Sequence, residues 1–157
     1  MSLKTNTTAQ VDVRGPRFAA WVTTAVLVLT LIVSASSVPT AAAILGAQAL
    51  VFAIGAWAGP RRHPYSLVFA SVVAPRLAPV SEREPAAPLR FAQLVGFVFA
   101  AIGVAGFVAG AALLGVIATA AALAAAFLNA AFGICLGCQL YPLVVRLRPA
   151  PRTSETA

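Results

Sequence analysis

The sequence predicts an all-α fold, an integral membrane four-helix bundle made of two transmembrane hairpins. Hydrophobic residues make up 61% of the 157 residues and charged residues only 10%, whereas charged residues average about 25% of a soluble domain. Four apolar runs approach the ~20 residues that a helix needs to cross a bilayer. The Lys and Arg residues avoid the short connections within both hairpins, and lie at Lys4, Arg14, Arg17, Arg61, Arg62, Arg76, Arg83, Arg90, Arg146, Arg148 and Arg152.

This one-sided charge predicts the orientation of the chain. Basic residues are retained on the cytoplasmic side of a membrane, so we expect a multi-pass protein of the bacterial inner (plasma) membrane with N- and C-termini in the cytoplasm. The same pattern accounts for the net charge of +7. We therefore expect contact with the lipid bilayer and no nucleic-acid partner.

The first hairpin follows a polar segment, residues 1–13, which we expect to be disordered. Span one covers about residues 18–37. The polar segment before it is long for a secretory signal, so we interpret the run as a retained span. Span two covers about 40–58 and ends before Gly59 and a proline. Because the turn between the two spans is short, they form an antiparallel pair.

The second hairpin contains span three, about residues 91–114, and span four, about 116–137, with a turn around Gly115. Span four is expected to continue as an interfacial helix to Leu147. The whole chain, 1–157, then forms a single membrane domain.

The cytoplasmic loop, residues 60–90, is the largest element outside the spans. Its apolar stretch 65–73 is too short to cross a bilayer. It is either an interfacial helix ending near Arg76 or a re-entrant, packed segment, and the sequence leaves both open. The prolines and charged residues that follow, at 75–88, predict an irregular solvated stretch.

Glycines recur on the spans at positions that favour close packing, including the GxxxG pair of Gly106 and Gly110. Small residues let helix backbones approach each other in lipid. We interpret these faces as packing within one bundle, with an oligomer through glycine-faced helices as the alternative. Acidic and basic residues are absent from the span centres, which argues against a pump or an ion-coupled transporter.

Cys135 and Cys138 form a CxxC motif, the one chemical motif of the chain. On a helix, residues three apart share a face, so a modest local distortion would allow a disulfide. The motif fits dithiol–disulfide exchange, sulfur transfer through a persulfide, or metal binding, and the alternative is that both residues only pack. A structural zinc site needs four ligands, and this chain has two cysteines and one histidine. The sequence therefore does not identify a metal for these cysteines, and we expect no cofactor.

The environment of the motif is predicted from its place in span four. The two cysteines are expected near the cytoplasmic, C-terminal end of that span, a position less favourable to a thiolate than a helix N-terminus. His63 is interpreted as a solvated loop histidine, with proton donation to a thiol as the alternative. Asn129 is expected to form an interhelical hydrogen bond on the face opposite the cysteines, and Gln48 and Gln93 to form similar bonds.

Four segments carry a family resemblance: residues 13–18 (VRGPRF), 59–62 (GPRR), 90–93 (RFAQ), and 132–138 (FGICLGC) with Tyr141. Over about residues 11–147 the chain resembles a family of small bacterial membrane proteins, domain of unknown function 4395. The resemblance implies an uncharacterised integral membrane protein. It also implies an association with rhodanese-type sulfurtransferases and thioredoxin-like proteins, which favours thiol or sulfur chemistry at the cysteines.

The resulting hypothesis is a membrane protein whose Cys135 and Cys138 carry out thiol–disulfide redox chemistry or a sulfur relay. Its partner would be a cytoplasmic thioredoxin-like or rhodanese-type protein. The alternative is a non-catalytic accessory or structural subunit of a membrane complex, and a third reading is a metal or small-solute carrier. Whether the protein is an enzyme stays open at this point.

Overall fold

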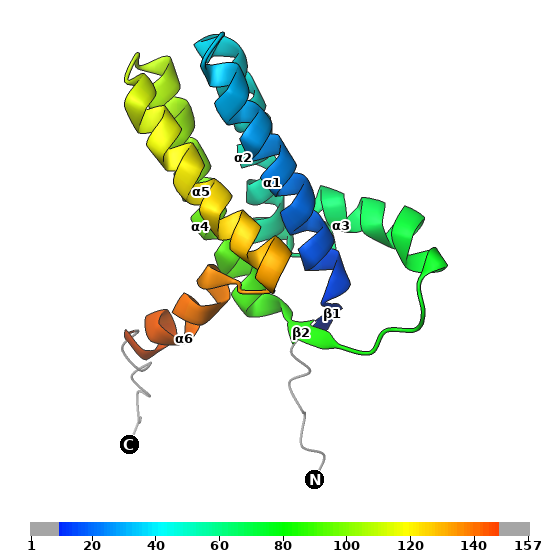
Figure 1. The fold of residues 1–157 in the computed structure, drawn as a ribbon. Helices are drawn as coiled ribbons and strands as arrows, with labels where there is room; N and C mark the ends of the chain where they lie inside the picture. The colour runs from blue at the N-terminus through cyan, green and yellow to red at the C-terminus, as the bar shows by residue number, and fades with distance from the viewer. Residues whose placement is uncertain (1–9, 148–157) are drawn as a thin grey trace, which may run out of the picture.

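The computed structural model describes residues 10–147 and is almost entirely helical. Within this range, four helices are long and apolar enough to cross a membrane (Figure 1). Their bounds are α1 Arg14–Ser34, α2 Val38–Ala58, α4 Ala86–Val108 and α5 Ala112–Phe132. The all-α membrane bundle is confirmed, and the chain is a multi-pass membrane protein.

The four long helices form a closed ring. α1 packs on α2 and on α5, and α4 packs on α2 and on α5, so α1 and α4 are diagonal to each other. The pairs α1–α2 and α4–α5 are the two expected hairpins, and Figure 1 shows each pair running side by side.

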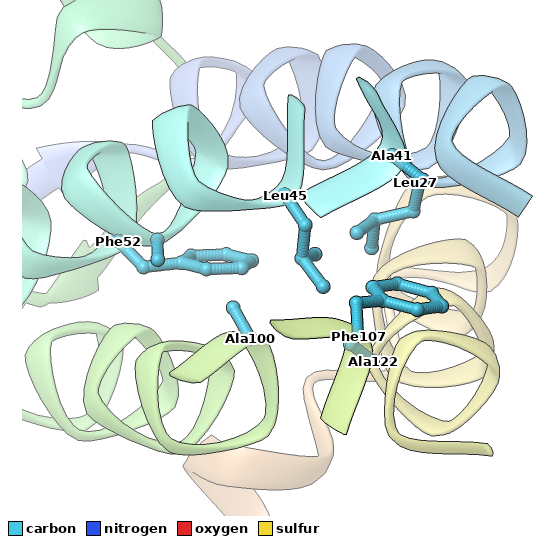
Figure 2. Close-up of a cluster of buried hydrophobic side chains, with 8 residues drawn as sticks. Leu27, Ala41, Leu45, Phe52, Ala100, Phe107 and Ala122 are labelled. Carbon is cyan, nitrogen blue, oxygen red and sulfur yellow. The ribbon is translucent and has the colours of Figure 1, made fainter. Parts of the chain in front are cut away.

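The core lies where the two hairpins meet. Leu27, Leu45, Phe52 and Phe107 are buried there among alanines of neighbouring helices (Figure 2). Glycines on α4 allow the close approach: an added Cβ at position 103 would lie 2.6 Å from the Leu45 side chain. Gly103 and Gly106 thus pack within the chain, as interpreted from the sequence. Gly110, the second member of the GxxxG pair, instead follows α4 with a positive φ of 78° and has no neighbour among the described residues within 4 Å of an added Cβ.

The two ends of the bundle differ in charge. At one end are the turns 35–37 and 109–111, which carry no charged residue. The basic residues of the described range lie toward the other end, where both ends of that range and the connecting loop are found (Figure 1). Lys4, Arg148 and Arg152 lie outside the described residues.

A short strand pair joins the start of the chain to the loop before the second hairpin. β1, Gln10–Asp12, pairs antiparallel with β2, Arg83–Pro85. Asp12 then forms an ion pair with Arg14 at 2.9 Å. The expectation of disorder is therefore wrong for residues 10–12, and the expected irregular stretch at 75–88 contains a strand, because each segment supplies the other's backbone partners.

The loop also forms a lateral helical segment, made of α3 Pro64–Val68, the π-helical turn Phe69–Val73 and the 3-10 turn Ala74–Arg76. It projects sideways from the bundle (Figure 1). Phe69 is buried, with its ring 5.7 Å from that of Phe18 on α1, whereas Leu67 is 54% exposed. One packed face and one exposed apolar face are what an interfacial helix requires.

The helix ends differ from the predicted spans. α4 begins five residues before the predicted 91, because Pro88 is tolerated in the first turn of a helix. α4 ends at Val108 instead of about 114, so the turn lies at 109–111, and Gly115, predicted to lie in the turn, is inside α5. Span four correspondingly begins at Ala112 and ends at Phe132 instead of about 137. Gly133 has a positive φ of 69° and ends the helix there.

Candidate functional site: the cysteine pair at the start of α6

The cysteines follow the glycine that ends α5. The Gly133 N–H donates to the Asn129 carbonyl at 3.1 Å, and the Ile134 N–H donates to the Leu128 carbonyl at 3.2 Å. These bonds close the last turn of α5, and a separate helix, α6 Leu136–Leu147, then leaves in a new direction (Figure 1).

Cys135 is therefore the residue immediately before α6, and Cys138 lies in its first turn. The two are joined by a disulfide, with Cα atoms 5.2 Å apart. The Cys138 N–H also points to the Cys135 sulfur, at 3.3 Å. The prediction that the pair belongs to the C-terminal end of a continuous span is wrong, because Gly133 breaks that helix and restarts it.

This position changes the electrostatics of the site. A helix N-terminus carries a partial charge of about +0.5 and free N–H groups, and such sites favour the thiolate form of cysteine. Both cysteines are half-buried at the basic end of the bundle. Within residues 10–147, no group of three His, Cys, Asp or Glu side chains is placed to hold a metal ion.

Gly137, between the cysteines, is the contact that holds α6 to the bundle. An added Cβ at this position would lie 2.5 Å from the Ala92 Cα and 2.6 Å from its Cβ. Only a glycine permits α6 to approach the α4 backbone this closely. The close approach fixes the cysteine pair against the first half of α4.

A cavity of about 330 Å³ opens beside the cysteine pair. It is lined by side chains of α1, α4, α5 and α6, which are mostly alanine and other apolar residues. Cys135, Asn129 and Gln93 contribute to its wall. The prediction that Asn129 lies opposite the cysteine face is wrong, because the chain turns at Gly133 after α5 and both residues line one cavity.

His63 is buried rather than solvated, so that prediction is also wrong. Its side chain is 2% exposed and packs with Gln93 against α2, where an added Cβ on Gly55 would lie 2.6 Å from the His63 ring. Burial lowers the pKa of His63 to about 4, and the neighbouring Gln93 side chain opposes this shift only in part. The imidazole is therefore neutral at pH 7.

The remaining amides form part of the same buried polar group. The Tyr65 hydroxyl donates to the Gln48 carbonyl oxygen at 2.7 Å, which confirms the expected interelement bond for Gln48. The Gln93 carbonyl oxygen is buried without a hydrogen-bond partner. Gln93 thus faces both the His63 group and the cavity, a role the sequence interpretation missed.

Comparison with known protein families identifies the family of this chain. The profile of one family, described as domain of unknown function (DUF4395), matches residues 11–146. The chain belongs to this family. The match covers the DUF4395 domain from β1 to α6 and includes both cysteines. No curated protein and no solved structure matches the chain significantly.

Proposed function

We propose that this DUF4395 protein carries out thiol–disulfide exchange at the membrane through Cys135 and Cys138. The observation that supports the proposal is the joined cysteine pair at the start of α6, half-buried beside a cavity. A disulfide next to reducing cytoplasm is usually transient and catalytic or redox-sensing. The basic end is proposed to face the bacterial cytoplasm, as the charge pattern favours.

The exchange assigns different roles to the two cysteines. In the oxidised state, a thiolate of a thioredoxin-like partner attacks one sulfur, and the S–S bond breaks as a mixed disulfide forms. The partner's second thiol then resolves the mixed disulfide and leaves the Cys135–Cys138 dithiol. In the reverse direction Cys135 is the attacking thiolate, since it precedes the helix and faces its N-terminus, and Cys138 is the resolving thiol.

A sulfur relay would use the same two residues. A persulfide transferred to Cys135 by a rhodanese-type partner would be attacked by Cys138, releasing hydrosulfide and forming the disulfide. Exchange with a dithiol partner is favoured because the pair already adopts the disulfide-bonded arrangement.

The test is the redox equilibrium of the cysteine pair in native membranes and in lipid nanodiscs. Samples are equilibrated with reduced and oxidised glutathione, acid-quenched and labelled with a mass-tagged alkylating reagent. The wild type is expected to gain two tags together over a defined potential range. With Cys138→Ser, Cys135 is expected to accumulate as a mixed disulfide with glutathione, whereas Cys135→Ser should accumulate far less.

Two results would contradict the proposal. One is a pair of free thiols that stay unchanged across the whole range of glutathione potentials. The other is equal mixed-disulfide yield from both single variants, which would remove the attacking role of Cys135. Release of tagged thiols only by a chelator would instead indicate metal binding.

A further inference from the structure

The cavity beside Cys135 lies among the helices of a membrane bundle. It extends from the cysteine end toward the middle of the spans, with Thr23 and Phe99 in its wall. Its volume of about 330 Å³ falls at the lower end of the range for small-molecule sites. Apolar walls of this kind favour an apolar ligand, and within a membrane such ligands are lipid-soluble.

The cysteine pair restricts what that ligand does. A disulfide and its dithiol differ by two electrons and two protons, so a ligand in contact with Cys135 that reacts with the pair must carry both. Among lipid-soluble molecules, quinones have this chemistry, and the ring of a quinone fits a cavity of this size.

The polar groups of the wall match a quinone in both redox states. A quinone presents only acceptor oxygens, and its quinol presents hydroxyl donors. The amides of Gln93, on α4, and Asn129, on α5, each offer a donor and an acceptor. The Gln93 carbonyl oxygen itself is buried beside His63, so a ligand in the cavity meets the rest of this side chain and the Asn129 amide.

His63 packs against the Gln93 side chain without lining the cavity itself. The two side chains pack together against Gly55, and His63 is almost fully buried. It acts as a positioning residue, because it contacts the amide and does not line the cavity.

We infer that this cavity binds a membrane quinone and that the reduced Cys135–Cys138 pair reduces it, an inference that rests on the proposed thiol–disulfide exchange. Two S–H bonds break and one S–S bond forms. The two electrons and two protons pass to the quinone, whose carbonyl oxygens become the two hydroxyls of the quinol. The cysteine pair would then accept electrons from a cytoplasmic dithiol and deliver them to the quinone pool.

The experiment uses the full chain in lipid nanodiscs, reduced, freed of reductant and kept without oxygen. The probe is a fully ring-substituted benzoquinone with a short isoprenoid tail, because full substitution prevents addition of thiols to the ring. Quinone absorbance and free thiols are followed in the same sample. The expected result is one quinol formed for each cysteine pair oxidised, with Cys135→Ser and Cys138→Ser inactive.

Adjacent alanines on α5 provide matched variants. Ala125 lines the cavity, and Ala124 is exposed on the outer face. Ala125→Phe fills part of the cavity and is expected to slow quinone reduction about tenfold or more, whereas Ala124→Phe should keep the wild-type rate. Asn129→Leu removes a polar contact with little change of volume, and should weaken quinone binding about tenfold, which keeps the test valid if Ala125→Phe fails to fold.

The outcomes separate this inference from the function on which it rests. A wild type that equilibrates with glutathione but does not reduce the quinone overturns the inference and leaves thiol exchange intact. Equal rates for the wild type, Asn129→Leu and the two alanine variants would place the reaction outside the cavity and overturn it as well. A wild type that fails to equilibrate with glutathione contradicts the proposed function, and the inference falls with it.

Discussion

The two hairpins end in the same way and present different chemistry. α2 and α5 both stop at a glycine with positive φ, Gly59 at 89° and Gly133 at 69°. Each glycine leads into a lateral helix at the basic end, α3 after the first hairpin and α6 after the second (Figure 1). The residue just before the lateral helix is His63 in one case and Cys135 in the other.

The difference lies in how each residue is held. His63 is buried by side chains, and its junction is fixed by Arg90, which donates to the Ala56 and Trp57 carbonyls at 2.9 and 2.7 Å. Cys135 stays half-buried, and its junction rests on the backbone contact between Gly137 and Ala92. Both junctions contact the first turns of α4, so one helix supports the buried polar group around His63 and the cysteine pair.

The largest expected effect comes from the buried histidine. Its folded-state pKa of about 4 is below the ordinary 6.5, so the unfolded chain binds more protons between these values and stability falls as the pH falls. The stability that comes from keeping the buried imidazole neutral is fully present above pH 6.5 and is lost toward pH 4. The loss amounts to up to about 3 kcal/mol. Thermal unfolding of the wild type in mild detergent across this pH range measures it.

His63→Gln is the control for this titration. It removes the ionisable ring but keeps a polar side chain of similar size, so its stability should depend much less on pH between 6.5 and 4. If the stability of this variant falls with pH as steeply as that of the wild type, other groups cause the pH dependence. The burial of His63 would then not distinguish its junction from that of Cys135.

A glycine exchange at each junction sharpens the comparison. An alanine at 137 would meet the α4 backbone at Ala92, whereas an alanine at 55 would meet only the side chains of His63 and Gln93. Backbone atoms yield less than side chains, so Gly137→Ala should destabilise by about 2 kcal/mol and Gly55→Ala by less. Chemical or thermal unfolding in detergent gives both values, with the exposed Gln139→Ala as the α6 reference.

Gly137→Ala should also alter the cysteine pair, because it moves the start of α6 away from α4. We expect a changed midpoint potential in the glutathione titration, and an unchanged one in Gly55→Ala. The opposite ranking of the two variants would mean that α6 is not anchored through Gly137.

The smallest effect is expected at Arg90. Arg90→Ala removes both hydrogen bonds to the end of α2, and because the guanidinium is exposed the loss should be about 1 kcal/mol. Unfolding in detergent is again the measurement, compared with Arg62→Ala, an exposed arginine in the turn after α2. If both arginine variants lose the same stability, the capping of α2 by Arg90 contributes nothing specific.

Hydropathy and charge were enough to predict the bundle, because a bilayer demands long apolar helices and retains basic residues on one side. Hydropathy and charge were not enough to predict where each helix ends. Gly133 stands inside a run that stays apolar past Leu136, and only its left-handed conformation separates α5 from α6. The sequence analysis therefore placed the cysteines at the C-terminal end of span four, whereas in the structure they lie at the N-terminal end of α6.

The rest of the site depends on contacts between distant residues. His63 follows two arginines and precedes a proline, which is typical of a solvated loop. Its burial requires the gap at Gly55 and the side chain of Gln93, 30 residues further along the chain (63 to 93). The available signal in the sequence was Gly55, which leaves room near the end of α2. That His63 and Gln93 fill this space could be seen only in the structure.

The strand pair has a consequence for how the protein is made. β1 is synthesised first, and its partner β2 emerges only after both helices of the first hairpin have left the ribosome. The pair can close only when residues 10–12 and 83–85 are on the same side of the membrane, so a first hairpin with only one of its two helices inserted could not form it. The closed pair therefore excludes a single-pass arrangement of the first hairpin.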